Sequence, residues 1–522
     1  MSVHALPMIG WLLMDGEQEK ETIDIDGMAF DVMIDTAETV IAKHPSLFQK
    51  SGELVNIVRQ RSGMVGFNHI HSSFVRYLLS KAVSWVDGEK GMIHPPPSIG
   101  RCLLEKDDHG PIKHLRTVVA FPPMDGAGSI CVEEGYNKET EVYFSGGVKV
   151  TVKDKPTKED AQSAIAELLD IVVDFPFAGE NHKAAWIAAV LTPLTRFMHS
   201  GNFPLAVFQS NGPRIGKTRL AKIISLIVTG ADCPFILQTN QEEERKRMLS
   251  FLKLGRSIGL IDNVTGEYGG ANLAAILTSR FFEDRTLGHS KMVVVSNDCF
   301  WMVSGNNIIL APDISERSLN VRLQCDDERP NLRTGWKHED LFKHVLDNRQ
   351  ALLSAAMTIL KAYITAGKPK QNIPQFGSFE EWNDLVCGAL VWAGMANPTS
   401  TREELEQEAD IHRVTSCGLV DGWLELQAEL GKFDGMTARE ARDALVDGDV
   451  KVTEFRDALL ERSQSRMITA AVIGRHLRTV KDINFGGRVL KCVELDSKKG
   501  NKWATVAAKQ GEKDVLAEPA GG

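Results

Sequence analysis

The sequence predicts an α/β protein whose centre is a parallel β-sheet, and two observations support this class. Between Pro204 and about Leu323, short apolar runs typical of buried strands alternate with helix-compatible segments, which is the pattern of a parallel sheet. Before residue 157 the strand-like and helical pieces are short and mixed, whereas residues 337–460 have helical periodicity. We therefore expect a parallel-sheet core between an N-terminal α+β domain and a helical C-terminal region.

Six segments follow from these changes in pattern. An N-terminal α+β domain (1–157), a helical linker (158–203), the sheet core (204–336) and a helical domain (337–460) precede a small basic domain (461–507) and a disordered tail (508–522). In the basic domain, a helical stretch is followed by an apolar run, a lysine-containing turn and a second apolar run. This order of a helix and a strand–turn–strand ribbon predicts a winged-helix-like domain.

Composition places the chain among ordinary globular proteins. Hydrophobic residues make up 43% and charged residues 25% of the 522 residues, both close to average. The eight cysteines contain no C-x-x-C pair, so we expect reduced thiols, mostly in the core, and a cytoplasmic protein. The apolar run Ala5–Met14 is too short to span a bilayer, so no membrane partner is expected. His109 and His114 have no partner at metal-ligand spacing and are expected on the surface.

The net charge of −9 conceals two regions of opposite sign. Residues 380–449 contain 16 acidic and 5 basic residues, a balance of −11, whereas residues 451–509 contain 13 basic and 6 acidic residues, a balance of +7. A basic terminal domain is typical of DNA contacts, although basic residues also solubilise a surface. The candidate DNA contacts in this domain are Arg475, Arg478, Lys481, Arg488, Lys498, Lys499 and Lys502.

One short motif carries most of the chemical information. The segment 211–218 follows the apolar run 205–208 and precedes the helix-compatible stretch 219–229, an order typical of phosphate-binding loops. In such loops, backbone N–H groups hold the phosphates, the lysine reaches the β and γ oxygens, and the hydroxyl binds Mg²⁺. Asn211 replaces the first glycine of the motif, and Asn tolerates a left-handed turn well. The predicted ATP-binding residues are Asn211, Gly212, Pro213, Arg214, Ile215, Gly216, Lys217 and Thr218.

Three further residues complete a candidate site for nucleotide hydrolysis. Asp262 follows the strand candidate 257–261, where the carboxyl ends of parallel strands meet, and is expected to bind Mg²⁺ together with the loop threonine. Asn306 follows the strand candidate 300–304 and is a candidate to position the attacking water. Arg317 is a candidate to neutralise transition-state charge on the ATP of a neighbouring subunit.

In this order, the motifs resemble those of superfamily 3 AAA+ helicases, and in particular the primase-associated modules of poxvirus, phage and plasmid type. The resemblance covers about residues 200–325 and includes Lys217-Thr218, Ile261-Asp262-Asn263, Ser304-Gly-Asn-Asn307 and Arg317. Looser similarity extends to flanking segments such as Asp174-Phe-Pro-Phe177. The resemblance implies an AAA+ ATPase core in a homo-oligomeric ring, expected to be a hexamer, with Asn306 as the sensor and Arg317 as the finger acting in trans. It also implies single-stranded or forked DNA as a partner.

In this superfamily, a β-hairpin before the sensor strand grips DNA through basic residues at its tip. Here the candidate hairpin spans residues 287–296, and residues 296–298 form a turn that leads directly into the sensor strand. That turn carries Asp298 and no lysine, and the nearest basic candidates, His289 and Lys291, are expected at the hairpin base. This arrangement supports ATP hydrolysis more than DNA translocation.

Two functions are compatible with these motifs. The first is an ATP-dependent DNA helicase or replication initiator of a phage, plasmid or integrated element. The second is a non-unwinding AAA+ switch, such as a helicase loader or regulatory assembly factor. The helicase is the leading hypothesis. One feature in favour of the switch is Asn263, which stands where a water-activating glutamate is usual, with Glu267 and Glu283 as candidate substitutes. A kinase would share the loop but leaves Asn306 and Arg317 unexplained, and a separate primase or replication protein is a further expected partner.

Overall fold

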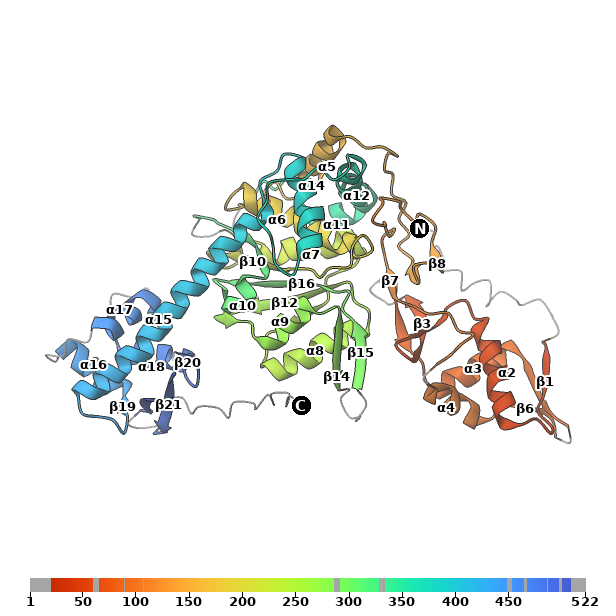
Figure 1. Ribbon diagram of the computed structural model, residues 1–522, viewed down its shortest axis with the longest axis horizontal. Helices are drawn as coiled ribbons and strands as arrows, with labels where there is room; N and C mark the ends of the chain where they lie inside the picture. Colours follow the sequence, from red (N-terminus) through yellow and green to blue (C-terminus); the bar gives the residue numbers. More distant parts are fainter. Residues whose placement is uncertain are drawn as a thin grey trace, which may run out of the picture. The chain divides into compact units, whose positions relative to one another are not determined.

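The computed structural model describes residues 20–59, 65–88, 90–106, 108–285, 292–327, 330, 334–447, 453–463, 467–485, 487–496 and 500–507. The chain divides into two compact units, Met1–Leu405 and Glu406–Gly522. The first unit contains the predicted parallel sheet together with helices, which confirms the mixed α/β class (Figure 1). The finer division into six segments stays a prediction.

The centre of the first unit is a five-stranded parallel sheet (Figure 1). Its strands, in spatial order, are β11 (Phe235–Leu237), β12 (Ile258–Val264), β16 (Phe300–Asn306), β10 (Leu205–Ser210) and β18 (Ser318–Leu323). Every residue of β10 is buried, as expected for a strand with helices on both faces. β16 carries Asn306 and lies between β10, which leads into the predicted loop, and β12, which carries Asp262. The three strands that carry predicted site residues are therefore neighbours.

The two faces of this sheet contact different helices, because side chains alternate along each strand. Phe208 and Met302 belong to a buried cluster on one face, and Val207 and Val303 belong to a cluster on the other. The first cluster includes residues of α5 (Lys158–Asp170), α6 (Glu180–Leu191), α7 (Lys217–Thr229) and α12 (Arg349–Thr365). The second includes residues of α8 (Gln241–Lys253) and α9 (Ala271–Thr278). The helices predicted after residue 158 therefore form one wall of the sheet core.

Shorter elements surround the sheet. They are η1 (Thr192–Thr195), α10 (Pro312–Ser315), α11 (Leu341–Asp347), α13 (Glu380–Trp382), η3 (Asn383–Cys387), α14 (Gly388–Trp392), η4 (Pro398–Thr401) and the strand pair β13 (Glu267–Tyr268) with β17 (Ile309–Leu310). The long helix α15 (Arg402–Glu429) begins in the first unit and continues into the second.

The predicted position of the β-hairpin is wrong. Its strands are β14 (Phe281–Arg285) and β15 (Met292–Ser296), which pair antiparallel. The segment 286–291 lies between these strands along the chain and outside the described residues, so the expected place of His289 and Lys291 at the hairpin base stays a prediction. Asp298 is not at the hairpin tip, because it follows β15, which ends at Ser296. Its carboxylate lies 3.5 Å from the Arg196 guanidinium.

The described residues that precede α5 form three small three-stranded sheets. Their strands are β1 (Thr22–Asp24), β5 (Ser84–Asp87) and β6 (Gly91–Ile93); β2 (Leu47–Lys50), β3 (Glu53–Arg59) and β4 (Val65–His69); and β7 (Thr117–Val119), β9 (Val142–Phe144) and β8 (Gly135–Asn137). The helices α2 (Phe30–Ala42), α3 (Ser72–Ala82) and α4 (Pro97–Glu105) accompany them. The mixed α+β character expected of this region is therefore present.

Two predictions about individual side chains are wrong. His109 is fully buried and its Nδ1 lies 2.9 Å from the carboxylate of Glu38, a partner 71 positions away in the sequence. Of the eight cysteines, only Cys233, Cys299 and Cys387 are buried, so the thiols are not mostly in the core. Both errors concern burial, which depends on contacts between residues far apart in the chain.

The second unit combines helices with a small antiparallel sheet. The helices are α16 (Ala438–Asp447), α17 (Thr453–Ser463) and α18 (Ala470–Thr479). The predicted ribbon forms as β21 (Arg488–Glu494) and β22 (Lys502–Ala507), and β20 (Asn484–Phe485) and β19 (Met436–Thr437) extend it to four strands. The predicted order of a helix and a hairpin is therefore observed, while the winged-helix assignment stays a prediction.

Candidate functional site

The predicted phosphate loop lies at the carboxyl edge of the parallel sheet. Residues 211–216 connect Ser210, the last residue of β10, to Lys217, the first residue of α7. Arg214 and Gly216 have positive φ angles of 63° and 112°, so the backbone is left-handed twice directly before the helix. Such turns beside a helix N-terminus direct backbone N–H groups toward one point, which is a geometry that binds anions.

Four predicted residues meet in front of this loop. The Lys217 ammonium donates to Asn306 Oδ1 over 2.6 Å, and the Thr218 hydroxyl donates to Asp262 Oδ1 over 3.1 Å. They meet because β10, β16 and β12 are neighbours and their carboxyl ends share one edge of the sheet. The structure therefore brings these side chains together, while their catalytic roles stay predictions.

A further member of this cluster, Ser304, is absent from the predicted site. Its buried hydroxyl donates to Asp262 Oδ1 and lies 3.1 Å from the Thr218 hydroxyl. Ser304 and Asn306 are two residues apart on β16, so both side chains lie on the same face of the strand. That spacing is the signal from which sequence reasoning could have included Ser304.

The Lys217 ammonium is poised to accept an anion. Burial lowers the pKa of Lys217 below its ordinary value, and the negative charge of Asp262 opposes this shift without cancelling it. The direct partner of the ammonium is the neutral Asn306 amide. A partly desolvated charge with a neutral partner gains from a nearby anion, so a phosphate group is a suitable ligand at this point.

The backbone beyond Asp262 is irregular. β12 continues to Val264, three residues past its predicted end, and its register against β16 shifts between Ile261 and Val264. Asn263 has a φ angle of 59°, and its N–H donates to Asp262 Oδ1 over 2.9 Å. Irregularities of this kind change the direction of side chains. Here the exposed Asn263 side chain occupies the position after Asp262 at which a water-activating glutamate is usual.

Asn211 does not adopt the left-handed conformation that its position in the motif predicts. The left-handed residues of the loop are Arg214 and Gly216. The Asn211 side chain instead makes two hydrogen bonds to the backbone of Cys325, just beyond β18. Its Nδ2 donates to the Cys325 carbonyl over 3.0 Å, and its Oδ1 accepts from the Cys325 N–H over 3.2 Å.

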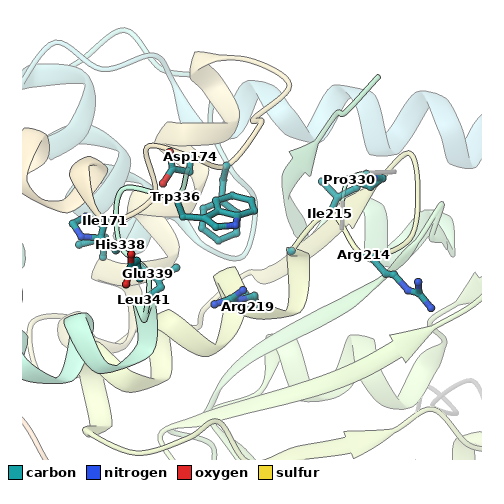
Figure 2. A pocket seen from close by; sticks show the side chains of 12 residues that line it. Ile171, Asp174, Arg214, Ile215, Arg219, Pro330, Trp336, His338, Glu339 and Leu341 are labelled. Carbon is teal, nitrogen blue, oxygen red and sulfur yellow. The ribbon is translucent and has the colours of Figure 1, made fainter. Parts of the chain in front are cut away.

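A cavity of about 280 Å³ lies beside the loop (Figure 2). Trp336 and Phe175 contribute aromatic side chains to its wall, and Gly216 and Arg219 contribute the side nearest the loop. The Phe175 ring approaches closely because residue 216 has no side chain: a Cβ there would lie 2.8 Å from Phe175 Cε1. In Figure 2, Asp174 lies beside Trp336, and its carboxylate accepts from the Lys337 N–H over 2.8 Å. The sequence placed Asp174 and Phe175 only in a segment that loosely resembles the flanks of superfamily 3 helicases, and it did not predict that they line a cavity.

Arg317 lies at the opposite edge of the sheet from the loop. Its carbonyl accepts from the N–H of Leu205, the first residue of β10, and β18 begins at the next residue. β10 has six residues, and strands rise about 3.3 Å per residue, which separates Arg317 from its own loop by roughly 17–20 Å. An arginine side chain does not span that distance, so Arg317 cannot serve the nucleotide of its own chain in this arrangement.

The predicted DNA contacts of the second unit are on its surface. Arg475 and Arg478 are exposed on α18. The others described form ion pairs: Arg488 with Asp421 at 2.6 Å, Lys502 with Glu494 at 2.6 Å, and Lys481 with Asp482 at 3.4 Å. Lys498 and Lys499 lie outside the described residues.

The described part of the chain contains neither a cluster of metal-ligating side chains nor a helix that could span a membrane. No three His, Cys, Asp or Glu side chains there are grouped as metal ligands. The predicted Mg²⁺ ligands are a hydroxyl and a single carboxylate, Thr218 and Asp262, so they would not form such a group. Among the described helices, none has the length and apolar character needed to cross a bilayer.

No protein-family model and no curated protein matches this chain. Among solved structures, the apo C-terminal region of NrS-1 aligns over 88% of this chain and 95% of that chain, with 9% identity and a TM-score of 0.38. The SCCmec type IV Cch active helicase aligns over 88% of this chain and 91% of that chain, with 11% identity and a TM-score of 0.33. Likeness at these identities and TM-scores does not assign a function to this chain.

Proposed function

We propose that this chain is an ATPase of the superfamily 3 AAA+ type. The observation that carries the proposal is the convergence of Lys217, Thr218, Asp262 and Asn306 in front of a left-handed loop. The Lys217 ammonium would neutralise charge on the β and γ phosphates, and the Asn306 amide would position the attacking water. Phosphoryl transfer depends mainly on such positioning and charge stabilisation, which this cluster supplies.

The donor set of the site fits Mg²⁺. The Thr218 hydroxyl and the Asp262 carboxylate present oxygen atoms 3.1 Å apart, and oxygen is the ligand atom that Mg²⁺ prefers. Ser304 supports the pair because its hydroxyl donates to the same carboxylate oxygen and fixes its orientation. When held by Thr218 and Asp262, Mg²⁺ would neutralise part of the phosphate charge.

The cavity beside the loop is the proposed place for the nucleotide base. Phe175 and Trp336 would contact its faces, as aromatic side chains do in many small-molecule sites. Arg219, on the first turn of α7, adds positive charge on the loop side. The cavity and the loop share Gly216, so a single ligand could occupy both.

We further propose that the ATPase assembles as a homo-oligomeric ring, a hexamer, and acts on DNA as a helicase or replication initiator of a mobile element. The distance of Arg317 from its own loop supports a role on the nucleotide of a neighbouring copy. The β14–β15 hairpin supports a DNA contact, because the connection between its strands carries His289 and Lys291. A separate primase would be a partner of this assembly.

One observation favours the alternative, a non-unwinding AAA+ switch. Asn263 follows Asp262, and its side chain cannot act as a general base for water as a glutamate would. An enzyme without that base would hydrolyse ATP slowly, and slow turnover suits a loader or assembly factor whose state follows the bound nucleotide.

Strand displacement on a forked duplex separates the two functions. If the protein is a helicase, the wild type should separate the strands in the presence of ATP and Mg²⁺. The strands should stay together when ATP is omitted and when the Lys217→Ala variant replaces the wild type. ATP hydrolysis without displacement of either strand would support the switch. Absence of ATP binding by the wild-type chain would overturn the ATPase proposal itself.

A further inference from the structure

The phosphate loop is attached to the end of β18 by one side chain. Asn211 bonds both the N–H and the carbonyl of Cys325, at 3.2 Å and 3.0 Å, across 114 positions of sequence. This reciprocal pair continues the β10–β18 ladder, whose last rung joins Ser210 and Leu323. A glycine at position 211 could make neither bond.

The same end of β18 also forms backbone hydrogen bonds with residues 176–178, which directly follow the cavity residue Phe175. The Gln324 N–H donates to the Pro176 carbonyl over 2.8 Å, and the Ala178 N–H donates to the Arg322 carbonyl over 3.0 Å. Phe175, directly before Pro176, lines the cavity. Residues 322–325 are therefore bonded to the loop on one side and to the cavity wall on the other.

We infer that Asn211 is a positioning residue that sets the distance between the phosphate loop and the cavity wall. The inference rests on the proposed nucleotide site, because it concerns a ligand that occupies loop and cavity together. A triphosphate alone contacts only the loop and does not depend on this distance. A nucleoside triphosphate must satisfy both places at once, so a preformed separation raises its affinity by reducing the ordering that binding requires.

The test compares Mg²⁺-ATP with Mg²⁺-tripolyphosphate by calorimetric titration of the full chain. Asn211→Gly restores the motif residue, and Asn211→Ala removes the same two bonds without adding backbone freedom. In both variants the affinity for ATP should fall by about tenfold, the loss expected from two partly exposed hydrogen bonds. The affinity for tripolyphosphate should fall by less than about threefold. Asn137→Gly is the matched control, because it removes side-chain bonds to the backbone of a distant turn and should leave both affinities unchanged.

Each contrary outcome has a distinct meaning. Equal losses for the two ligands would overturn the inference, since the side chain would then shape the loop alone. Unchanged ATP affinity in both variants, or a loss in Asn211→Gly only, would overturn it as well. If the wild-type chain binds neither ligand, the proposed function fails, and that result is distinguishable from all of these. Unchanged melting temperatures would establish that the variants fold.

Discussion

The carboxyl edge of the parallel sheet and the basic surface of the second unit use polar side chains in different ways. At the sheet edge, Lys217 donates to Asn306, while Thr218 and the buried Ser304 both donate to Asp262. The predicted DNA contacts that the structure describes in the second unit are exposed or paired singly with an acid. The first arrangement creates a site with fixed geometry, and the second creates a charged surface.

This difference indicates how each region can contribute to function. A partly buried cluster holds its charges and dipoles in place, so it can stabilise charge that develops during a reaction. Exposed basic residues attract phosphates through a field that salt screens, and they hold no fixed geometry. Substitutions should therefore have large effects at the sheet edge and smaller, salt-dependent effects in the second unit.

Lys217→Ala should have the largest effect. Loss of the ammonium removes both the phosphate contact and transition-state neutralisation, so ATP turnover should fall by at least about 10⁴-fold. Phosphate release by the purified protein measures this. Lys222→Ala is the matched control, because Lys222 lies on the same helix and pairs with Asp232. Wild-type turnover in Lys217→Ala, or an equal loss in the control, would contradict the site.

Arg317→Ala should have the second-largest effect on ATP turnover. Hydrolysis should fall by about 10³-fold, the lower end for an arginine finger, while ATP binding stays within about threefold because the residue is remote from its own loop. Turnover and titration with ATP measure the two effects separately. Mixed with Lys217→Ala subunits, Arg317→Ala subunits should regain turnover, since an intact loop then meets an intact arginine. No recovery in mixtures shown to co-assemble would argue against action in trans.

Substitutions in the second unit should have the smallest effects. Replacing Arg475 and Arg478 by Gln should weaken DNA binding by about fivefold at low salt and reduce the dependence of affinity on salt, because fewer phosphate contacts release fewer counterions. Fluorescence anisotropy at several salt concentrations measures both. Replacing Arg488 and Lys502 is the comparison, since each already pairs with an acid and should matter less. If the paired residues matter more, the exposed face of α18 is not the DNA surface.

Much of the local structure could be predicted from residue patterns. The strands expected at 205–208 and 300–304 are β10 and β16, each two residues longer, and the helix expected from residue 219 is α7, which begins at residue 217. Apolar runs and a glycine-containing turn encode these elements, because the relevant contacts lie within a few residues. The capping interaction of Thr437 with Glu440 is also local, and their reciprocal bonds are present.

The wrong predictions have two causes. The hairpin pairs residues close in sequence, 281–285 with 292–296, and its register depends on cross-strand contacts that the pattern of residues does not specify. The burial of His109 and the hydrogen bonds of Asn211 depend on partners 71 and 114 positions away. For these two side chains, the deciding interaction joins residues that no short window of sequence contains.

The sequence by itself determined the α/β class, the phosphate loop and the order of Asp262, Asn306 and Arg317 along the chain. Periodicity and loop motifs involve residues close together in the sequence, so they can be recognised without knowing which distant segments pack nearby. Only the tertiary structure decided that β16 lies between β10 and β12, that Ser304 joins the cluster, and that Asn211 bonds Cys325. Strand order and long-range hydrogen bonds depend on packing between distant segments, which local pattern does not specify.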